Sequence, residues 1–182
     1  DTTEGEQLEV RMGVSFVSVE NARLNLEAEQ QERSFDDIRA AARRSWNDDL
    51  GRIRVEGGTD AQKKVFYTGL YHALIHPNVL SDVNGEYPAM ESAEIRTAEG
   101  NRYTVFSLWD TYRNLHQLMT LVYPERQLEM VRSMIGMYKE WGWLPKWELY
   151  GRETFTMEGD PAIPVIVDTW MKGLRDFDMD AA

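Results

Sequence analysis

The sequence contains no cysteine among its 182 residues. Disulfide bridges, thiolate metal sites and a cysteine nucleophile are therefore excluded, although the compartment stays open. The chain also lacks an apolar run near the roughly 20 residues that a helix needs to cross a bilayer, so we expect no membrane span. It opens with no basic–apolar–small signal pattern and contains no Asn-x-Ser/Thr acceptor for N-glycosylation.

Positive charge is scarce, with 20 Lys and Arg against 31 Asp and Glu and a net charge of −11. Such a chain repels phosphate backbones, which excludes nucleic acid as a partner. Gly-rich phosphate loops, a G-x-S-x-G elbow and a dinucleotide fingerprint are absent as well. Aromatic residues are plentiful instead, with six Trp and eight Tyr, and they either pack a core or line a pocket.

Strict alternation of apolar and polar residues marks the stretch "LEVRMGVSF", residues 8–16. Period two over nine residues predicts a half-buried strand. An isolated strand leaves its backbone and its apolar face without partners. We therefore expect the partner strands outside this chain.

Six segments carry helical periodicity or helix start signals. The helices are expected at 18–29, 35–50, from 59 to the His76-Pro77 pair, and at about 107–122, 124–140 and 160–178. Residues 77–104 are expected to form a loop. A long loop rich in aromatics separates the last two helices, and loops of that length are uncommon unless they are functional.

The stretch "SLWDTYR", residues 107–113, has two interpretations. Ser107 and Asp110 match the S-x-x-D capping pattern, in which Asp110 accepts a bond from the Ser107 amide. Alternatively, Asp110 and Arg113 share a helix face and offer acceptors and donors to the vicinal hydroxyls of a sugar. The ring of Trp109 would then cover the C–H surface of that sugar. Both interpretations stay open at this point.

The stretch "GWLPKWELYGRET" is a second candidate. Glu148 beside Trp147 would hold a sugar hydroxyl, or act as an acid whose pKa is raised in an apolar pocket. The alternative is a loop packed over helix ends, with Glu148 paired to Lys146 or Arg152. The density of aromatic residues in this loop favours a site.

Metal-binding patterns are weak. Asp82, Asn84 and Glu86 resemble part of a calcium loop, but the twelve-residue spacing is missing, so a turn network is the favoured interpretation. The three histidines form no H-E-x-x-H pattern and are interpreted as structural. The stretch "DFDMD", residues 176–180, is interpreted as a solvated helix end.

Four blocks, taken in order, carry a family resemblance. They read "GVSFVSVENARLNLEAE", "HPNVLSDVNGEY", "YTVFSLWDTYRNLHQLMTL" and "GWLPKWELYGRETFTMEGDPAIPVIVDTWMKG". Together they resemble glycoside hydrolase family 92, whose members are calcium-dependent exo-acting α-mannosidases, mostly from bacteria that digest N-glycans or yeast mannan.

The resemblance implies a mainly α fold in which a β-sandwich domain leads through a linker helix into an (α/α)6 barrel. Residues 1–34 would be the end of the N-terminal β-sandwich domain and its connection. Residues 35–58 would be the linker helix region, and residues 59–182 the first, truncated part of the catalytic barrel. A barrel of about twelve helices of ordinary length needs more chain than this, so the sequence is interpreted as an internal fragment.

The same resemblance implies calcium-dependent inverting hydrolysis that releases terminal mannose, with α-1,2 linkages preferred. The catalytic acid and base of the family lie in a Glu-Gly-Asn block and an Asn-Asp/Glu-Asp block, with a His-Gly-Asn-Glu-Pro block near the calcium. We expect all three blocks, and the Ca2+ ligands, beyond residue 182, so that the fragment alone is inactive. The substrate contacts carried over to this chain are Trp109, Asp110, Arg113, Trp147 and Glu148.

The expected partners are a mannose-containing glycan and the remainder of the same polypeptide. Export from a bacterial cell, to the periplasm, the cell surface or the medium, follows from the resemblance. Two alternatives stay open, namely another (α/α)6 glycosidase and an inactive glycan-binding module.

Overall fold

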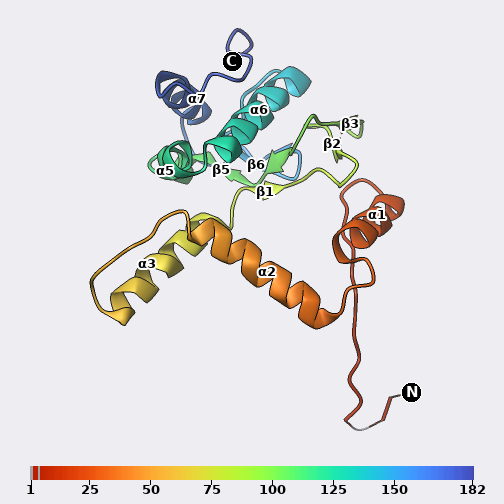
Figure 1. The fold of residues 1–182 in the computed structure, drawn as a ribbon. Coiled ribbons are helices and arrows are strands. Elements are labelled where there is room, and N and C mark those ends of the chain that lie inside the picture. The colour runs from red at the N-terminus through yellow and green to blue at the C-terminus, as the bar shows by residue number, and fades with distance from the viewer. Residues whose placement is uncertain (1, 4) are drawn as a thin grey trace.

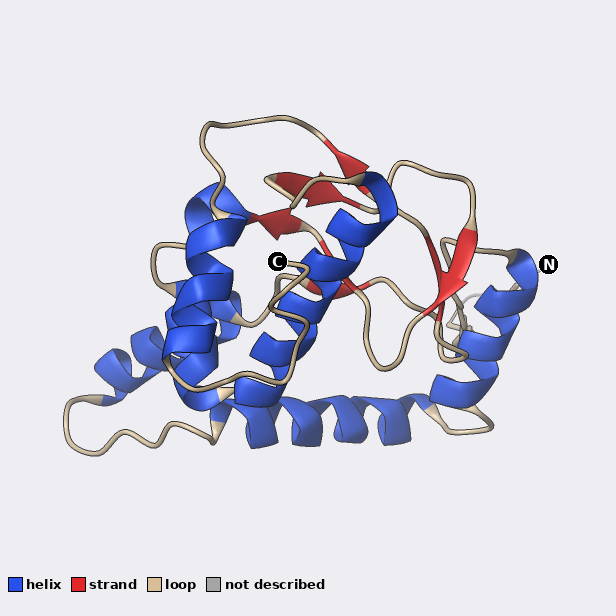
Figure 2. Ribbon diagram, turned by 90° about the horizontal axis from the view of Figure 1, so that it is seen from above, coloured by secondary structure: helices blue, strands red, loops and turns tan. Residues whose placement is uncertain are grey.

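Figure 1 shows the chain as a computed structural model, which describes residues 2–3 and 5–182. The described part is mainly helical, with seven helices and seven strands of two or three residues each. Helices α5, α6 and α7 form an upper body with the strands, while α2 and α3 lie beneath it and α1 lies to one side (Figures 1 and 2). This confirms the mainly helical fold class.

Four of the expected helices form close to their predicted bounds. They are α1 (Val19–Gln30), α2 (Phe35–Leu50), α3 (Asp60–Ala73) and α6 (Pro124–Trp141). Ser34 and Thr59 each form a complete capping box at the start of α2 and α3, which satisfies backbone N–H groups that the helix leaves free. Gly142 ends α6 at a φ of 94°, in the left-handed region that favours glycine.

The expected helix at 107–122 is wrong in one respect, because it is two helices. A turn at 112–114 separates α4 (Leu108–Thr111) from α5 (Leu115–Val122). The expected helix at 160–178 is also shorter, since α7 covers Ala162–Met171. Gly173 takes a φ of 92° after the helix and stops it, a signal that the prediction overlooked.

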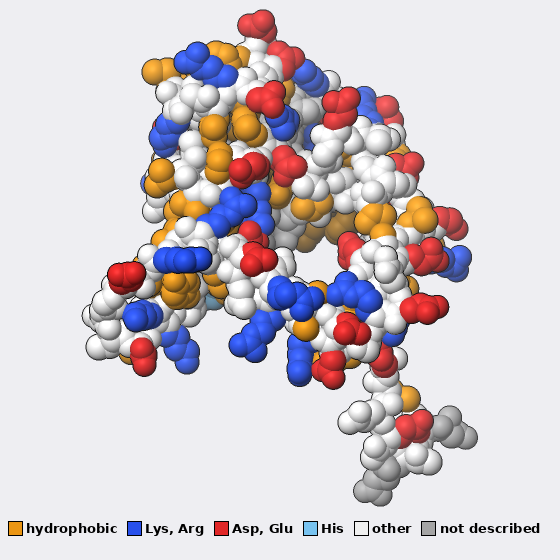
Figure 3. Space-filling view, viewed as in Figure 1, with side chains coloured by type: hydrophobic (Ala, Val, Ile, Leu, Met, Phe, Trp, Pro, Cys, Tyr) orange, Lys and Arg blue, Asp and Glu red, His pale blue; other side chains and the backbone are white. Residues whose placement is uncertain are grey.

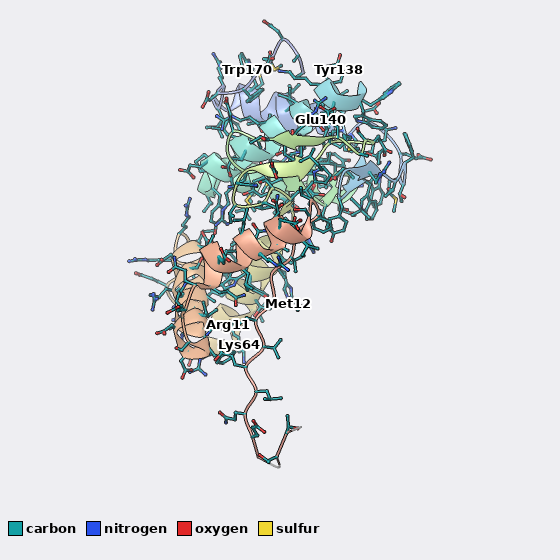
Figure 4. All side chains as sticks on the ribbon, turned by 90° about the vertical axis from the view of Figure 1, so that its right-hand side faces the viewer. Arg11, Met12, Lys64, Tyr138, Glu140 and Trp170 are labelled. Atoms are coloured by element: carbon teal, nitrogen blue, oxygen red, sulfur yellow. The ribbon has the colours of Figure 1, made fainter. Side chains whose placement is uncertain are left out.

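The strand predicted at 8–16, whose partner strands were expected outside this chain, does not form among the described residues. The segment is extended but has no regular secondary structure, and its apolar side chains stay exposed, from 50% for Phe16 to 83% for Val10. No described strand pairs with it, and a lone strand cannot satisfy its own backbone. Figure 4 shows Arg11 and Met12 on this segment, well below the body that holds Tyr138 and Trp170.

Residues 77–104, expected as a loop, contain four short strands. The strands are β1 (Asn78–Val79), β2 (Glu86–Pro88), β3 (Ile95–Thr97) and β4 (Tyr103–Thr104). Strand β1 pairs with β4 and β2 pairs with β3, both antiparallel. Strands of two or three residues show no alternation that a sequence pattern can detect.

A third sheet joins segments that are far apart in the sequence. Strand β6 (Trp147–Leu149) lies between β5 (Phe106–Ser107) and β7 (Arg152–Glu153), with antiparallel pairing on both sides. The sheet therefore brings the stretch "SLWDTYR" next to the stretch "GWLPKWELYGRET".

The core is built mainly on α6 and α7. Its buried members include several methionines and aliphatic residues from these two helices together with residues of the short strands. The largest cluster contains Met90, Tyr103, Phe106, Leu108, Met130, Val131, Met134, Ile135, Met137, Ala162, Val165 and Ile166. A smaller cluster of Leu70, Met119 and Tyr123 joins α3 to α5. By contrast, α2 buries none of its residues, and basic side chains lie along it in Figure 3.

A buried polar network joins α1 to the loop before β2. The carboxylate of Asp82 accepts bonds from Asn25 Nδ2 at 2.6 Å, Asn21 Nδ2 at 2.8 Å and Ser15 Oγ at 2.6 Å. Asn21 Nδ2 also donates to Glu86 at 2.8 Å. The turn network expected around Asp82 and Glu86 is therefore confirmed, and it reaches further than the sequence suggested.

The chain after α7 is not a solvated helix end. Phe177, Met179 and Ala181 pack against the main core, while the aspartates between them face outward. Asp178 pairs with Lys139 of α6 at 2.6 Å. The expected helix end is an extended segment that runs back along α6.

A buried ion pair fastens the β2–β4 region to α6. Arg102 Nη2 lies 2.9 Å from Glu140 Oε2, and the two side chains are only 4% and 3% exposed. Glu140, labelled in Figure 4, also accepts bonds from the Tyr87 hydroxyl at 2.9 Å and the Met90 amide at 2.7 Å. Arg102 fits here because position 136 is glycine, since a Cβ at Gly136 would overlap the guanidinium.

In the part of the chain that the structure describes, every helix is too short or too polar to cross a membrane.

Replacing Glu140 by alanine tests the buried ion pair. E140A leaves Arg102 charged and unpaired in the interior, so the free energy of unfolding should fall by about 3–5 kcal/mol. D176A is the matched control, because Asp176 is the exposed ion-pair partner of Arg132, which lies on α6 as Glu140 does. D176A should lower the free energy of unfolding by less than about 1 kcal/mol. Chemical denaturation measures both values, and equal losses would contradict the assignment.

Candidate functional site

Helix α4 and the residues on either side of it carry the "SLWDTYR" side chains. Leu108 is fully buried in the main core, and its amide donates to the Lys146 carbonyl at 3.2 Å. In the strand before it, Ser107 lies opposite Trp147 in the β5–β6 pair. The start of α4 is thus fixed to the second candidate stretch by backbone pairing.

Asp110 does not form the predicted capping box. Ser107 makes no capping bond to the backbone of α4, and its hydroxyl donates to the Asp110 carboxylate instead. Asp110 remains exposed in the first turn of α4. A bond to a hydroxyl still leaves acceptor positions free on the carboxylate.

Arg113 lies over two aromatic rings. Its guanidinium carbon is 4.8 Å from the centroid of the Trp109 ring and 5.1 Å from that of Tyr112. None of the described ion pairs joins Arg113 to Asp110, because Arg113 lies in the turn after α4 and not on a shared helix face as expected. The stack holds Trp109, which is 37% exposed, beside an exposed guanidinium.

Trp147 and Glu148 are neighbours on β6 with different surroundings. Trp147 is partly exposed, whereas Glu148 is completely buried. The Glu148 carboxylate accepts bonds from Thr104 Oγ1 at 2.8 Å, the Val105 amide at 3.1 Å and the Gly151 amide at 2.5 Å. Burial raises the pKa of Glu148, while the bonds from Gly151 and Thr104 act against that rise. The alternative interpretation, in which Glu148 pairs with Lys146 or Arg152, is not supported, because among the described ion pairs Lys146 binds Asp160 and Arg152 binds Glu91.

Glu153 supports the same loop from the other side, a role that the sequence did not suggest. Its carboxylate accepts bonds from the amides of Lys146 at 2.8 Å, Trp147 at 3.1 Å and Phe155 at 2.9 Å. Lys146 forms its ion pair with Asp160 instead. Two acidic side chains of the loop therefore hold its backbone and do not face solvent.

A chain of hydrogen bonds supports α4 from the core. Thr111 Oγ1 lies 3.1 Å from His116 Nε2, and His116 Nδ1 lies 3.0 Å from Gln127 Oε1. Gln127 then donates to Thr169 Oγ1 at 2.9 Å, and Thr169 donates to the Val165 carbonyl. The interpretation of His116 as structural is borne out by these contacts.

Burial keeps His116 neutral within this chain of hydrogen bonds. Gln127 accepts through its carbonyl oxygen, so Nδ1 carries the proton and Nε2 accepts from Thr111. Burial lowers the pKa of His116 to about 4, and the bond to Gln127 acts weakly against it. Protonation would place a charge in the interior, which is costly because the site is shielded from water.

The profile of the glycosyl hydrolase family 92 catalytic domain matches residues 21–182. The chain belongs to glycosyl hydrolase family 92. The resemblance given by the four sequence blocks is thereby confirmed.

Solved members of the family share the fold of this chain. A GH92 α-mannosidase from Bacteroides thetaiotaomicron is 36% identical with a TM-score of 0.87, covering 92% of this chain and 22% of that one. It has also been solved in complex with mannoimidazole. A GH92 inverting mannosidase from Bacteroides thetaiotaomicron VPI-5482 is 34% identical with a TM-score of 0.86. The match covers 92% of this chain and 23% of that one.

A curated relative comes from Arthroderma benhamiae and is named "Uncharacterized secreted glycosidase". It is 26% identical over 181 residues, which are 97% of this chain and 19% of that protein. This family 92 chain therefore spans about a fifth of the length of these relatives.

Calcium does not fit the residues described. No group of three or more His, Asp or Glu in residues 2–3 and 5–182 is arranged to hold a metal ion. In the acidic pair Asp82 and Glu86, both oxygens of Asp82 and Oε2 of Glu86 accept bonds from amide or hydroxyl donors. These hydrogen bonds use carboxylate lone pairs that a cation would need.

Tripeptides with the residues of two of the blocks expected beyond residue 182 also occur within this family 92 chain. The location of the catalytic blocks themselves stays a prediction. Residues 99–101 read Glu-Gly-Asn and lie between β3 and β4, with Asn101 bonded to Glu129. Residues 47–49 read Asn-Asp-Asp and end α2, with Asp49 paired to Arg126 at 2.6 Å. No described bond joins either tripeptide to Trp109, Asp110, Arg113 or Trp147, so neither carries an argument for catalysis.

His116 makes the stability of the chain depend on pH. Its lowered pKa means that, between pH 6.5 and about 4, the unfolded chain binds a proton that the folded chain does not. The contribution of neutral His116 to the free energy of unfolding is fully present above pH 6.5. It is lost as the pH falls towards 4, by about 3 kcal/mol in total. H116Q should remove this part of the slope in denaturation curves, whereas H72Q at an exposed histidine should keep it. An unchanged slope in H116Q would contradict the assignment.

Proposed function

We propose that the whole protein is an exo-acting α-mannosidase and that this chain supplies part of the wall that binds the terminal mannose. The observation that carries the proposal is the pairing of β5 with β6 in a family 92 chain. That pairing places Ser107, from which α4 and its residues Trp109 and Asp110 follow directly, opposite Trp147.

The arrangement suits a pyranose. Asp110 offers acceptors and Arg113 offers donors, and such groups bind vicinal hydroxyls by charge-assisted hydrogen bonds. Exposed parts of Trp109 and Trp147 offer flat apolar faces to the C–H side of a sugar. Glu148 remains part of the proposed site, but its three internal bonds give it a supporting role in place of the direct sugar contact first expected.

The finer parts of the proposal follow from the family. The protein releases terminal mannose, with α-1,2 linkages preferred, from N-glycans or mannan by calcium-dependent inverting hydrolysis. In inverting hydrolysis an acid protonates the leaving oxygen and a carboxylate activates water. We propose that these two carboxyl groups and the Ca2+ ligands lie outside this chain, and that the protein acts outside the cytoplasm of a bacterium.

Asp110 is the first residue to test. In the full-length protein, D110A should lower kcat/KM for an α-1,2-mannobiose by about 100-fold, because bonds from a carboxylate to two sugar hydroxyls are lost. D36A is the matched control, since Asp36 is also an exposed acid in the first turn of a helix. D36A should leave kcat/KM unchanged.

The outcomes separate the candidates. If D110A keeps its activity and loses only about 1 kcal/mol of stability, Asp110 has a local structural role alone. A full-length protein that binds mannose but hydrolyses neither mannobiose nor other glycosides would support the glycan-binding alternative. Hydrolysis of another glycoside in preference to mannosides would support a different glycosidase.

The 182-residue chain by itself should release no mannose from mannobiose, with or without added Ca2+. The reason is that the described residues contain one wall of the proposed site but no acid–base pair across it. Chromatography of the released sugar is the measurement, with full-length protein as the positive control. Calcium-dependent release by the chain alone would contradict the location proposed for the catalytic groups.

A further inference from the structure

We propose that Thr104 and Glu148 are positioning residues. Their buried hydrogen bonds, called the relay below, fix the backbone at Val105 before β5 and the turn between β6 and β7. The relay thereby sets how Trp109 and Asp110 lie relative to Trp147. This rests on the proposed function for its effect on activity. The relay itself rests on contacts within the chain.

Thr104 is the centre of the relay. Its hydroxyl donates to Glu148 at 2.8 Å and accepts from the Tyr150 amide at 2.7 Å. Thr104 is 1% exposed and Glu148 is fully buried, so water does not compete for these bonds. One side chain from β4 thus links the carboxylate to the turn on the far side of β6.

The first position that the relay holds is Val105. This residue stands alone between β4, which pairs with β1, and β5, which pairs with β6. Its φ is 63°, a left-handed conformation that β-branched residues rarely adopt. The Val105 amide donates to Glu148 at 3.1 Å, which holds the corner where the chain passes from one sheet to the other. Strand β5 and then α4 leave from that corner.

The second position is the turn between β6 and β7. Leu149 pairs with Arg152, so Tyr150 and Gly151 form a two-residue turn, with φ values of 52° and 80°. Such turns favour Asn or Gly at the first position, because both central residues need a positive φ. Here the Tyr150 amide binds Thr104 and the Gly151 amide binds Glu148 at 2.5 Å. The relay therefore supports a turn that its own sequence disfavours.

A supporting group of this kind acts on geometry. A shift of about 1 Å in groups that hold a substrate can cost about 100-fold in rate. Loss of the relay frees the Val105 corner and the Tyr150 turn together, so α4 and β6 lose their fixed separation. Neither Thr104 nor Glu148 has to touch the sugar for this to occur.

The test compares Thr104→Val with Thr104→Ser in the full-length protein. T104V keeps the shape but removes the hydroxyl, and it should lower kcat/KM on mannobiose by about 10- to 100-fold. T104S keeps the hydroxyl and should retain activity within about threefold of the wild type. Glu148→Gln should behave like T104V, because its amide nitrogen would face one of the donors.

Tyr87→Phe is the matched control for stability. It also removes one buried hydroxyl bond, at Glu140, but on the contact between β2 and α6. Y87F should lower the melting temperature about as much as T104V and leave kcat/KM unchanged. Equal losses of activity in T104V and Y87F, or full activity in T104V, would overturn the positioning role.

Hydrogen exchange keeps the two proposals separable. The amides of Val105, Tyr150 and Gly151 should be protected in the wild type and should exchange faster in T104V but not in Y87F. Slow exchange of these amides in T104V would overturn the relay. If the wild-type protein has no mannosidase activity, the proposed function fails while the exchange result still decides the relay.

Discussion

The carboxylate of Glu148 connects parts of the chain that no long strand connects. It accepts bonds from Thr104 and Val105, which lie 44 and 43 residues away in the sequence, and from Gly151 in its own hairpin. A buried charge of this kind is costly unless every lone pair finds a donor. The backbone around it must therefore present its N–H groups inward, and this requirement shapes both candidate loops.

Strained backbone conformations are concentrated in and beside the same two loops. Six described residues other than glycine have a positive φ, and five of them lie in or beside these loops. They are Glu91, Val105, Tyr150, Phe155 and Met157. Such conformations persist only where surrounding contacts determine them, and they concentrate at ligand sites. The amides of Glu91, Val105, Tyr150 and Phe155 each have a hydrogen-bond acceptor, which explains how the loops keep their shape.

The sequence predicted local structure well and long-range structure poorly. The bounds of α2 were predictable because its signals are local, with Asp36 and Asp37 in its first turn and Gly51 at its end. The structure adds a capping box between Ser34 and Asp37. Gly142 likewise marked the end of α6. The strand at 8–16 depends on partner strands that were expected outside this chain, and alternation alone cannot supply them.

The sequence pointed to the segments of the candidate site but not to the long-range contacts that bring them together. Composition pointed to the two stretches that β5 and β6 bring together, but the pairing itself depends on contacts about 40 residues apart. Glu148 was singled out beside Trp147, although adjacent residues on a strand point to opposite faces. That alternation puts the carboxylate inside and leaves the tryptophan at the surface. No spacing rule could have identified Thr104, because its partners come from another hairpin.

Helix α4 shows why the supporting residues matter as much as those at the surface. It has four residues, far fewer than a helix needs to be stable alone. Its position depends on Leu108 in the core, on the bond from Thr111 to His116 and on the corner at Val105. Asp110 and Trp109 are therefore only as well placed as these buried contacts make them. Substitutions that loosen the interior beneath α4 should resemble substitutions of the residues that it presents.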